Sequence, residues 1–360
     1  MGRLVMYIKK FSALVVAATL LSPLSAEAAR KMSFVMAHKP ENIENVKLIE
    51  NFANKVRERT NGEIDISLFM PPESADFQRA LDEVYLGKSE FSQIATKHFL
   101  PVSQDLDVLD MPMLFETHEH ATKVLDGDVG AALRDGVYRD SNGRLKGLSF
   151  TYSGGFRHVY STKDVDSVAE LKGQKMRLRG GRFSLDAMDQ LGLDYVYTAP
   201  GDYTGWANMH LTGEIEAEEA ETNRIATYKY RHPEMSKTIK TVLETNHSLY
   251  LTMVVMNGEA FTSLTPMQQK IVQEEAQNLA VAERDLSIRQ EQDSKKQMMS
   301  EGVKFVTMDA EDKAILAAMG QRIHEKYRPT MGRWIDAIKA AAPQGKVKES
   351  KVKGTAAKPL

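Results

Sequence analysis

Two arginines twenty residues apart are the side chains best suited to chemistry in this sequence. Arg157 lies among glycine, aromatic and hydroxyl residues in "YSGGFRHVYSTK", and Arg177 lies in "GQKMRLRGG". A guanidinium offers two parallel N–H donors that match a carboxylate, and in a water-poor cleft this pair provides orientation as well as binding energy. Gly154 and Gly155 would let a ligand approach the backbone closely. The pattern favours binding of a small carboxylic acid, although two surface arginines remain the alternative.

Other motifs for catalysis or metal binding are incomplete. The near-match to a serine-hydrolase elbow at Gly147 to Thr151 ends in threonine, and "HEKYR" at His324 lacks the second histidine of a zinc motif. On a helix, His118 and His120 of "HEH" would point to different faces, so we expect both histidine motifs on solvated helix surfaces. The acidic run "GEIEAEEAET" lacks the ligand spacing of a calcium loop, and we expect a charged helix face. We therefore expect neither a metal nor a cofactor.

The segments that must position the arginines are predicted to form two successive α/β lobes. Hydrophobic periodicity predicts strand, helix, strand, helix and strand in "KMSFVMAH", "NVKLIENFANKVRERTNG", "EIDISLF", "ADFQRALDEVYLG" and "EFSQIAT". This order implies a parallel sheet with crossover helices. A second α/β stretch begins near "LKGLSFTYSGGFRHVYS" and continues through "LTGEIEAEEAET". Within it, alternation places Arg177 and Arg179 on one strand face and Met176 and Leu178 on the other.

The chain then returns through the apolar strand "LYLTMVVMNGEAF" to a long polar helix. Thr265 can cap this helix, and Pro266 fits its first turn. At about 1.5 Å per residue the helix is longer than one lobe, so we expect it to cross between the two lobes. The predicted units are a signal peptide at 1–28, lobe I at 29–153 plus 247–284, lobe II at 154–246 plus 285–312, C-terminal helices at 313–342, and a disordered tail at 343–360.

Composition limits the cellular location of the protein and the classes of partner it can bind. The 360 residues are 42% hydrophobic, with 47 basic and 49 acidic residues and a net charge of -2, so no global field attracts nucleic acid or anionic membranes. The sequence has no cysteine, which excludes disulfides and thiolate chemistry. A basic, then apolar, then small-residue N-terminus predicts a secretory signal cleaved near residues 26–29. We expect an exported protein without direct membrane insertion.

From about Lys31 to Ala342 the chain resembles the substrate-binding proteins of TRAP transporters, the DctP-like family. The similarity rests on "NFANKVRERTNGEIDISLF", "LDMPMLFETHEHATKVLDGDVG", "GGFRHVYSTKDVDSVAELKGQKMRLRGG" and "LTPMQQKIVQEEAQ", in this order and spacing. The resemblance implies an α/β, periplasmic binding protein-like fold of two lobes with a hinge. It also implies a periplasmic location and two partners, a small organic acid ligand and the TRAP membrane subunits.

The same resemblance implies roles for individual residues. Arg177 corresponds to the arginine that bridges to the ligand carboxylate, and Arg157 corresponds to a second contact. Where the family usually has an asparagine the present chain has Ala220, so Asn223 is the candidate replacement. The segment "YTAPGDYTGWANMH" also departs from the family, and Tyr203 or Trp206 there is the candidate aromatic wall.

Three residues of the first lobe are further candidate ligand contacts. His38, Glu73 and Thr96 follow strands of the predicted parallel sheet, where ligands of open α/β sheets bind. Each also has a local explanation, since His38 could cap a loop, Glu73 could cap the next helix and Thr96 could bond the backbone. The function we expect is capture of an organic acid for a TRAP transporter. The alternatives are an exported enzyme acting on a carboxylate and the ligand-binding module of a sensory system.

Overall fold

The computed structural model describes residues 28–37, 43–70, 77–178, 181–198, 203–231, 234 and 237–343. The strands of this part form one mixed nine-stranded sheet in the order β2-β1-β3-β8-β4-β7-β5-β6, with β9 beside β8. The strands are β1 (Arg30–Val35), β2 (Ile64–Phe69), β3 (Phe91–Ala95), β4 (Leu145–Ser161), β5 (Lys175–Leu178), β6 (Asp194–Tyr197), β7 (Ala217–Glu221), β8 (Thr241–Asn257) and β9 (Lys304–Val306).

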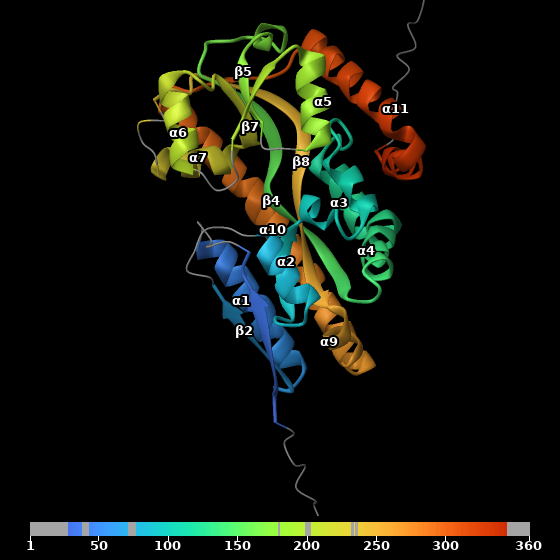
Figure 1. Ribbon diagram of the computed structural model, residues 1–360. Coiled ribbons are helices and arrows are strands. Elements are labelled where there is room, and N and C mark those ends of the chain that lie inside the picture. Colours follow the sequence, from blue (N-terminus) through green and yellow to red (C-terminus); the bar gives the residue numbers. More distant parts are fainter. Residues whose placement is uncertain are drawn as a thin grey trace, which may run out of the picture.

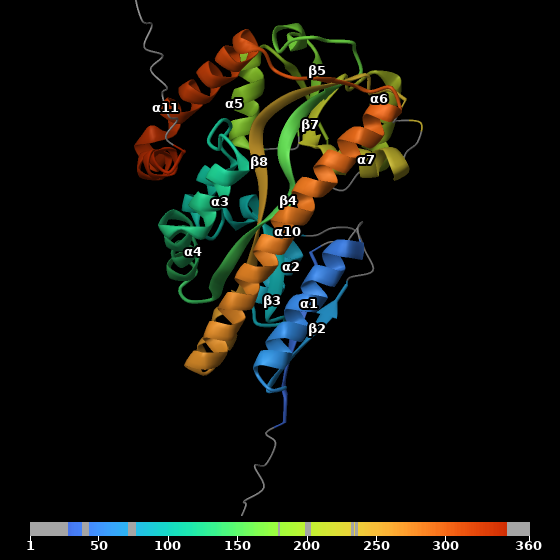
Figure 2. The ribbon, with the colours of Figure 1, turned by 180° about the vertical axis from the view of Figure 1, so that it is seen from behind.

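Helices cover both faces of this sheet (Figures 1 and 2). The α-helices are α1 (Ile43–Arg59), α2 (Phe77–Tyr85), α3 (His118–Asp126), α4 (Asp128–Asp140), α5 (Arg182–Leu191), α6 (Tyr203–Thr212), α7 (Thr222–Arg231), α9 (Gly258–Thr262), α10 (Pro266–Ser300) and α11 (Ala310–Ala340). Short 3-10 helices are η1 (Thr96–Phe99), η2 (Gln104–Asp110) and η3 (Ala169–Leu171).

The sheet divides into two lobes joined by its two longest strands. In lobe I, β1 pairs in parallel with β2 and β3, as the strand and helix order predicts. In lobe II, β5 pairs in parallel with β6 and β7. The 17-residue strands β4 and β8 pair antiparallel along their length and run from one lobe into the other (Figure 1). The predicted two-lobed α/β fold is confirmed.

The ladder between β4 and β8 is interrupted where the lobes meet. Leu251 and Tyr250 are neighbours on β8, but their partners on β4 are Tyr152 and Gly155. Residues 153–154 therefore form a bulge, which bends a strand and increases its twist. The predicted lobe boundary between residues 153 and 154 falls inside this bulge, and the boundaries themselves stay a prediction.

Glycine is required at this bulge for two reasons. Gly154 and Gly155 have φ angles of +110° and +92°, a region that residues with a Cβ rarely adopt. A Cβ on Gly154 would lie 2.4 Å from Oδ1 of Asn223, and one on Gly155 would lie 2.8 Å from Oε2 of Glu291. With glycine at both positions, the backbone of the bulge can approach the side chains of Asn223 on α7 and Glu291 on α10. A residue with a Cβ could not come as close.

Helix α10 packs against both lobes. Thr265 caps its N-terminus in a capping box, as predicted. Near its start, Glu275 pairs with Arg59 of α1 in lobe I, and near its end Met298 lies in a hydrophobic cluster of lobe II. Figure 2 shows the helix running diagonally across the back of the molecule, past α1 and then α7. The prediction of a helix that spans both lobes is confirmed.

The prediction that the two histidine motifs lie on solvated surfaces is wrong for His120 and His324. Their exposed fractions are 1% and 2%. His120 Nε2 lies 2.8 Å from the carbonyl oxygen of Ile338, and His324 Nε2 lies 2.9 Å from that of Pro112. Both bonds fasten α11 to the segment around η2 and α3, a long-range contact that the local polarity of the motifs does not reveal. In the described part of the chain, no group of three or more histidine, aspartate or glutamate side chains is placed to hold a metal ion.

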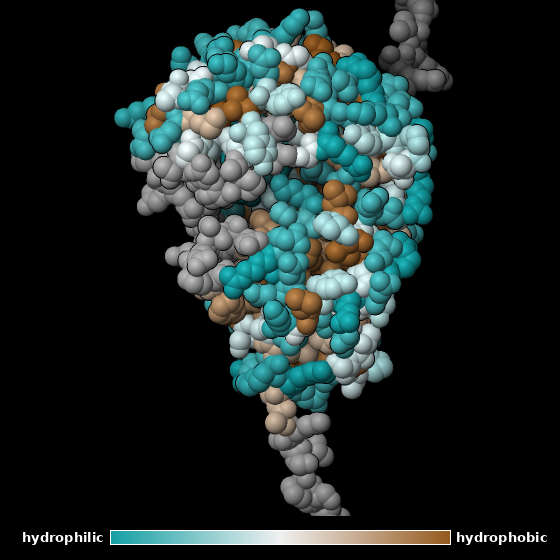
Figure 3. Space-filling view, in the orientation of Figure 1, coloured by the Kyte–Doolittle hydropathy of each residue, from teal (hydrophilic) through white to brown (hydrophobic). Residues whose placement is uncertain are grey.

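The surface offers no broad apolar area on the face seen in Figure 3. Hydrophilic residues cover most of it, and hydrophobic residues form small separate patches. Scattered apolar side chains of this kind are normal for a protein surface. Among the described helices, none combines the length and the apolar character that crossing a bilayer requires. The predicted signal at 1–28 and tail at 343–360 lie almost wholly outside the described residues.

Candidate ligand-binding site

Arg157 is buried in the middle of the sheet, on the lobe II side of the bulge. It lies on β4 opposite Glu221 of β7. Its Nη1 and Nε atoms lie 3.2 Å from carboxylate oxygens of Glu219 and Glu221, respectively. Burial would lower the pKa of Arg157, but these two carboxylates outweigh it and raise the pKa above its ordinary value. Arg157 is therefore a fixed cation with acidic neighbours.

Arg177 is equally buried but lies on the other face of the sheet. Its strand neighbour Met176 pairs with Ala217, which shares a face of β7 with Glu219 and Glu221, so Arg177 points the opposite way. There its Nη1 lies 3.3 Å from Glu218. Its guanidinium carbon also lies 4.4 Å from the centre of the Trp206 ring. Met176 and Arg177 thus project to opposite faces, as the predicted alternation requires, whereas Arg179 lies outside the described residues. Because Arg157 and Arg177 are 6% and 5% exposed, the alternative of two surface arginines is wrong.

The acidic run that supplies these partners is a buried strand. Glu218 and Glu221 are 0% and 1% exposed, so the expectation of a charged helix face is wrong. These two carboxylates can be buried here because arginines from β4, β5 and α7 pair with them. Burial would raise the pKa of Glu219, but Arg157 and a hydrogen bond with His247 outweigh it and hold that pKa well below its usual range.

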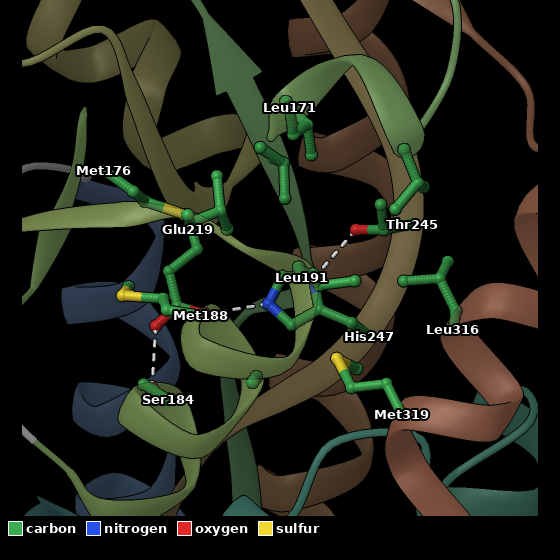
Figure 4. A pocket seen from close by; sticks show the side chains of 14 residues that line it. Leu171, Met176, Ser184, Met188, Leu191, Glu219, Thr245, His247, Leu316 and Met319 are labelled. Atoms are coloured by element: carbon green, nitrogen blue, oxygen red, sulfur yellow. Dashed lines mark hydrogen bonds and ion pairs between the residues drawn. The ribbon is translucent and has the colours of Figure 1, made fainter. Parts of the chain in front are cut away.

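A small cavity lies beside Glu219 (Figure 4). Most of its lining is apolar, and its polar groups form one chain in which Ser184 donates to Glu219, and His247 lies between Glu219 and Thr245, 2.8 Å from each. The cavity measures about 20 Å³, which is room for a water molecule but not for an organic acid. It lies between α5, β7, β8 and α11, and at this volume it does not hold an organic acid.

Cations from both lobes surround one aromatic ring at the bulge. The ring of Tyr250 has the guanidinium carbons of Arg157 and Arg224 at 4.8 and 5.2 Å, and the ammonium of Lys97 at 5.7 Å from its centre. Lys97 belongs to η1 of lobe I, whereas the two arginines belong to lobe II. Asp110 adjoins this group: burial raises its pKa to about 6, against the opposing charges of Arg157 and Lys97. We call Lys97, Arg157, Arg224 and Tyr250 the Tyr250 cluster.

Comparison with known proteins assigns the chain to a family. The family model described as bacterial extracellular solute-binding protein, family 7 (DctP), matches residues 34–330. The chain belongs to this family. The DctP family contains the substrate-binding proteins of TRAP transporters, and its members bind solutes in the periplasm. The resemblance expected from the sequence is confirmed.

Relatives within the DctP family extend over most of the chain. The 2,3-diketo-L-gulonate-binding periplasmic protein of Escherichia coli K12 is 27% identical over 293 residues, covering 81% of this chain and 85% of that protein. The C4-dicarboxylate-binding periplasmic protein of Rhodobacter capsulatus is 23% identical, covering 87% and 91%. A solved TRAP periplasmic solute-binding protein from Pseudomonas putida F1 with bound D-glucuronate has a TM-score of 0.73 at 25% identity, covering 88% and 98%.

The remaining residues proposed from sequence lie in different environments. Thr96 is buried and donates to the carbonyl oxygen of Leu251, which fits the local explanation given for it. Trp206 is 1% exposed and stacks on Arg177. Asn223 lies against the bulge, and its Oδ1 is buried without a hydrogen-bond partner. Tyr203 begins α6, but its side chain, like His38 and Glu73, lies outside the described residues.

Sequence reasoning missed several residues that the DctP fold brings to this region. These are Lys97, Glu218, Glu219, Arg224, His247 and Tyr250. Tyr250 lies within the predicted apolar strand, where nothing local distinguishes it from a core aromatic residue. β7 reads AEEAE, which does not alternate strictly, and its acidic composition favoured a helix instead. The cations around Tyr250 come from three distant segments, so no spacing in the sequence connects them.

Proposed function

We propose that this chain is an exported solute-binding protein that captures a small organic acid between its lobes and delivers it to a TRAP-type membrane transporter. The observation that carries the proposal is the meeting of cations from both lobes at Tyr250. A carboxylate entering between the lobes would be attracted from both sides, and closure would strengthen this attraction by excluding water. The N-terminal signal, cleaved near residues 26–29, belongs to the same proposal.

Relatives of the family support an acidic ligand. The P. putida protein holds D-glucuronate, and the E. coli relative is a 2,3-diketo-L-gulonate-binding protein. Each of these solutes is a sugar acid with one carboxylate. Micromolar affinity corresponds to about -8 kcal/mol, which one charge-assisted carboxylate contact and several hydrogen bonds can supply.

Arg157 and Arg177 are proposed as ligand contacts within this function. Because each already pairs with a glutamate, a ligand carboxylate would have to share or replace that partner. Arg157 is the better placed of the two, since it adjoins Tyr250 where the lobes meet. Arg177 contributes to binding only if the ligand reaches the face of the sheet covered by α6.

A thermal-shift screen tests the proposed function. The purified mature protein is heated alone and with D-glucuronate, D-galacturonate, succinate, N-acetylneuraminate and, as a neutral control, D-glucose. We expect at least one acid to raise the melting temperature while D-glucose does not. If no acid in a broad panel stabilises the protein, the proposed function is wrong. Mass spectrometry of the acid recovered after incubation separates a binder from an enzyme, because a binder returns it unchanged.

A further inference from the structure

The C-terminal helix α11 is fixed firmly to lobe I. Two buried histidines, His120 of α3 and His324 of α11, contact backbone carbonyl oxygens across this interface. Gly320 of α11 lies so close to Met113 that a Cβ on the glycine would be 2.5 Å from the Cβ of Met113. Buried and closely packed contacts of this kind tolerate little displacement. Helix α11 should therefore move together with lobe I.

The contact between α11 and α5 of lobe II is of a different kind. Nζ of Lys326 lies 2.6 Å from Oδ1 of Asp186, and Nε of Arg322 donates to Oε1 of Gln190 at 2.5 Å. The two helices lie side by side in both views of the molecule (Figures 1 and 2). The side chain of Lys326 is 57% exposed, and exposed ion pairs stabilise only weakly. These bonds can therefore break and form again at little cost.

The apolar part of the same contact is incompletely packed. The cavity of about 20 Å³ is lined by Met188 and Leu191 of α5 and by Leu316 and Met319 of α11 (Figure 4). Protein interiors contain few voids large enough for water, and methionine side chains adapt readily to changed surroundings. Helix α5 can therefore shift along α11 without a large loss of packing.

Arg182, the first residue of α5, joins lobe II directly to lobe I. Its Nη2 lies 2.5 Å from Oδ2 of Asp107 in η2. Its guanidinium carbon also lies 4.9 Å from the centre of the Tyr327 ring on α11. The side chain of Asp107 is only 9% exposed, so separating α5 from lobe I would leave a buried carboxylate without this cation. The pair therefore opposes separation of the lobes at this edge.

We propose that α11 is a brace, fixed to lobe I, along which α5 slides when lobe II moves, and that the contacts of α5 with α11 and η2 limit how far the lobes separate. Small sliding movements of packed helices are a common form of domain motion. In this arrangement the bulge at residues 153–154 allows the sheet to bend, and the brace limits the bend. The inference goes beyond the proposed function, because it holds whatever solute the protein binds.

Distance measurements between the lobes of the ligand-free protein test this inference. The chain has no cysteine, so nitroxide labels can be attached selectively at Asn54→Cys on α1 and Leu211→Cys on α6, both exposed positions. Pulsed electron paramagnetic resonance then gives the distribution of distances between the two labels. Lys326→Asp replaces the ion pair with Asp186 by repulsion, so longer distances should gain about threefold over the distance that this structure defines. Arg182→Gln should shift the distribution in the same direction.

A charge exchange and a neighbouring residue provide the controls. Adding Asp186→Lys to Lys326→Asp restores the pair with its charges exchanged and should restore the distances of the parent protein. Arg328→Asp changes the charge of α11 by the same amount, but the partners of Arg328 are Glu325 and Asp336 of α11 itself. This control should leave the distance between the lobes unchanged.

The outcomes bear on the brace alone. If Lys326→Asp and Arg182→Gln leave the distance distribution unchanged, the inference is wrong. It is also wrong if Arg328→Asp has the same effect as Lys326→Asp, or if the charge exchange does not restore the parental distances. Because no solute is present in these measurements, such a failure leaves the proposed function standing, and the thermal-shift screen tests that function separately.

Discussion

Arg157 and Arg177 point to opposite faces of the sheet, although both donate to glutamates of the same strand. Arg157 contacts Glu219 at 3.2 Å, and Arg177 contacts Glu218 at 3.3 Å. Adjacent residues of a strand project in opposite directions, so the two ion pairs are separated by β7 itself. Substituting one arginine should therefore leave the partners of the other in place. The contribution of each arginine to stability and to ligand binding can then be measured separately.

Replacing Arg177 should abolish stabilisation by an organic acid if this residue contacts the ligand as proposed. Arg177→Ala also leaves Glu218 buried without its cation, so the unliganded protein should melt at a lower temperature. The measurement is the melting temperature with and without D-glucuronate.

A double substitution separates the ligand effect from the folding effect. Arg177→Gln with Glu218→Gln removes both charges and leaves a neutral hydrogen-bonding pair, which should fold better than Arg177→Ala. If this variant binds D-glucuronate as tightly as the parent, Arg177 is not a ligand contact.

Adding a methyl group at the bulge should destabilise the protein by more than backbone strain alone. Gly155 and Gly302 have φ angles of +92° and +91°, but a Cβ would meet Glu291 at 2.8 Å only at Gly155. Gly302→Ala should cost about 1 kcal/mol from strain, and Gly155→Ala about 2–4 kcal/mol because strain and the clash add. Urea unfolding of both variants gives the comparison. If both substitutions lower the free energy of unfolding equally, the carboxylate of Glu291 moves aside without an energetic cost.

Glu283 should make the stability of the protein depend on pH. It is 3% exposed and accepts hydrogen bonds from the backbone N–H of Tyr152 and from Ser287. Burial raises its pKa to about 8, against the lowering effects of these bonds and of Arg284. A raised carboxyl pKa favours the protonated folded state, so this contribution to stability is present below about pH 4.5 to 5 and is lost as the pH rises to about 8.

Glu283→Gln tests this pH dependence. The amide oxygen can still accept from Tyr152, but the group no longer ionises. Melting temperatures of the variant should fall less than those of the parent between about pH 5 and pH 8. If the melting temperatures of the two proteins change with pH in the same way, the raised pKa of Glu283 is contradicted.

The N-terminal cap of α10 should contribute measurably to stability. Thr265 accepts from the backbone N–H of Gln268, whose side chain returns a bond to the backbone of Thr265. Thr265→Ala should cost about 1 kcal/mol, the usual value for loss of a cap. Ser300→Ala, at the exposed other end of the helix, should change stability by less than about 0.5 kcal/mol. If Thr265→Ala and Ser300→Ala lower the free energy of unfolding by similar amounts, the capping box does not stabilise this helix.

Much of the architecture follows from local patterns in the sequence. The periodicity in residues 30–95 predicts β1, α1, β2, α2 and β3, and Thr265 with Pro266 marks the start of α10. Periodicity and capping depend on residues within a few positions of one another, which is why they can be recognised without a structure. The two arginines stand out for a similar reason, because their local settings and spacing resemble those of a known family.

The environment of those arginines depended on the tertiary structure. From the sequence, Glu218 looks like part of a solvated helix, but in the fold it is buried and pairs with Arg177, which lies over Trp206. Tyr250 looks like a core residue, but Lys97 and Arg224 from other segments lie against its ring. A charged side chain can be buried only where the fold places an opposite charge beside it. The sequence by itself determined the lobes, the long helix and the family. Only the packing of distant segments decided which face each arginine occupies and where cations from both lobes meet.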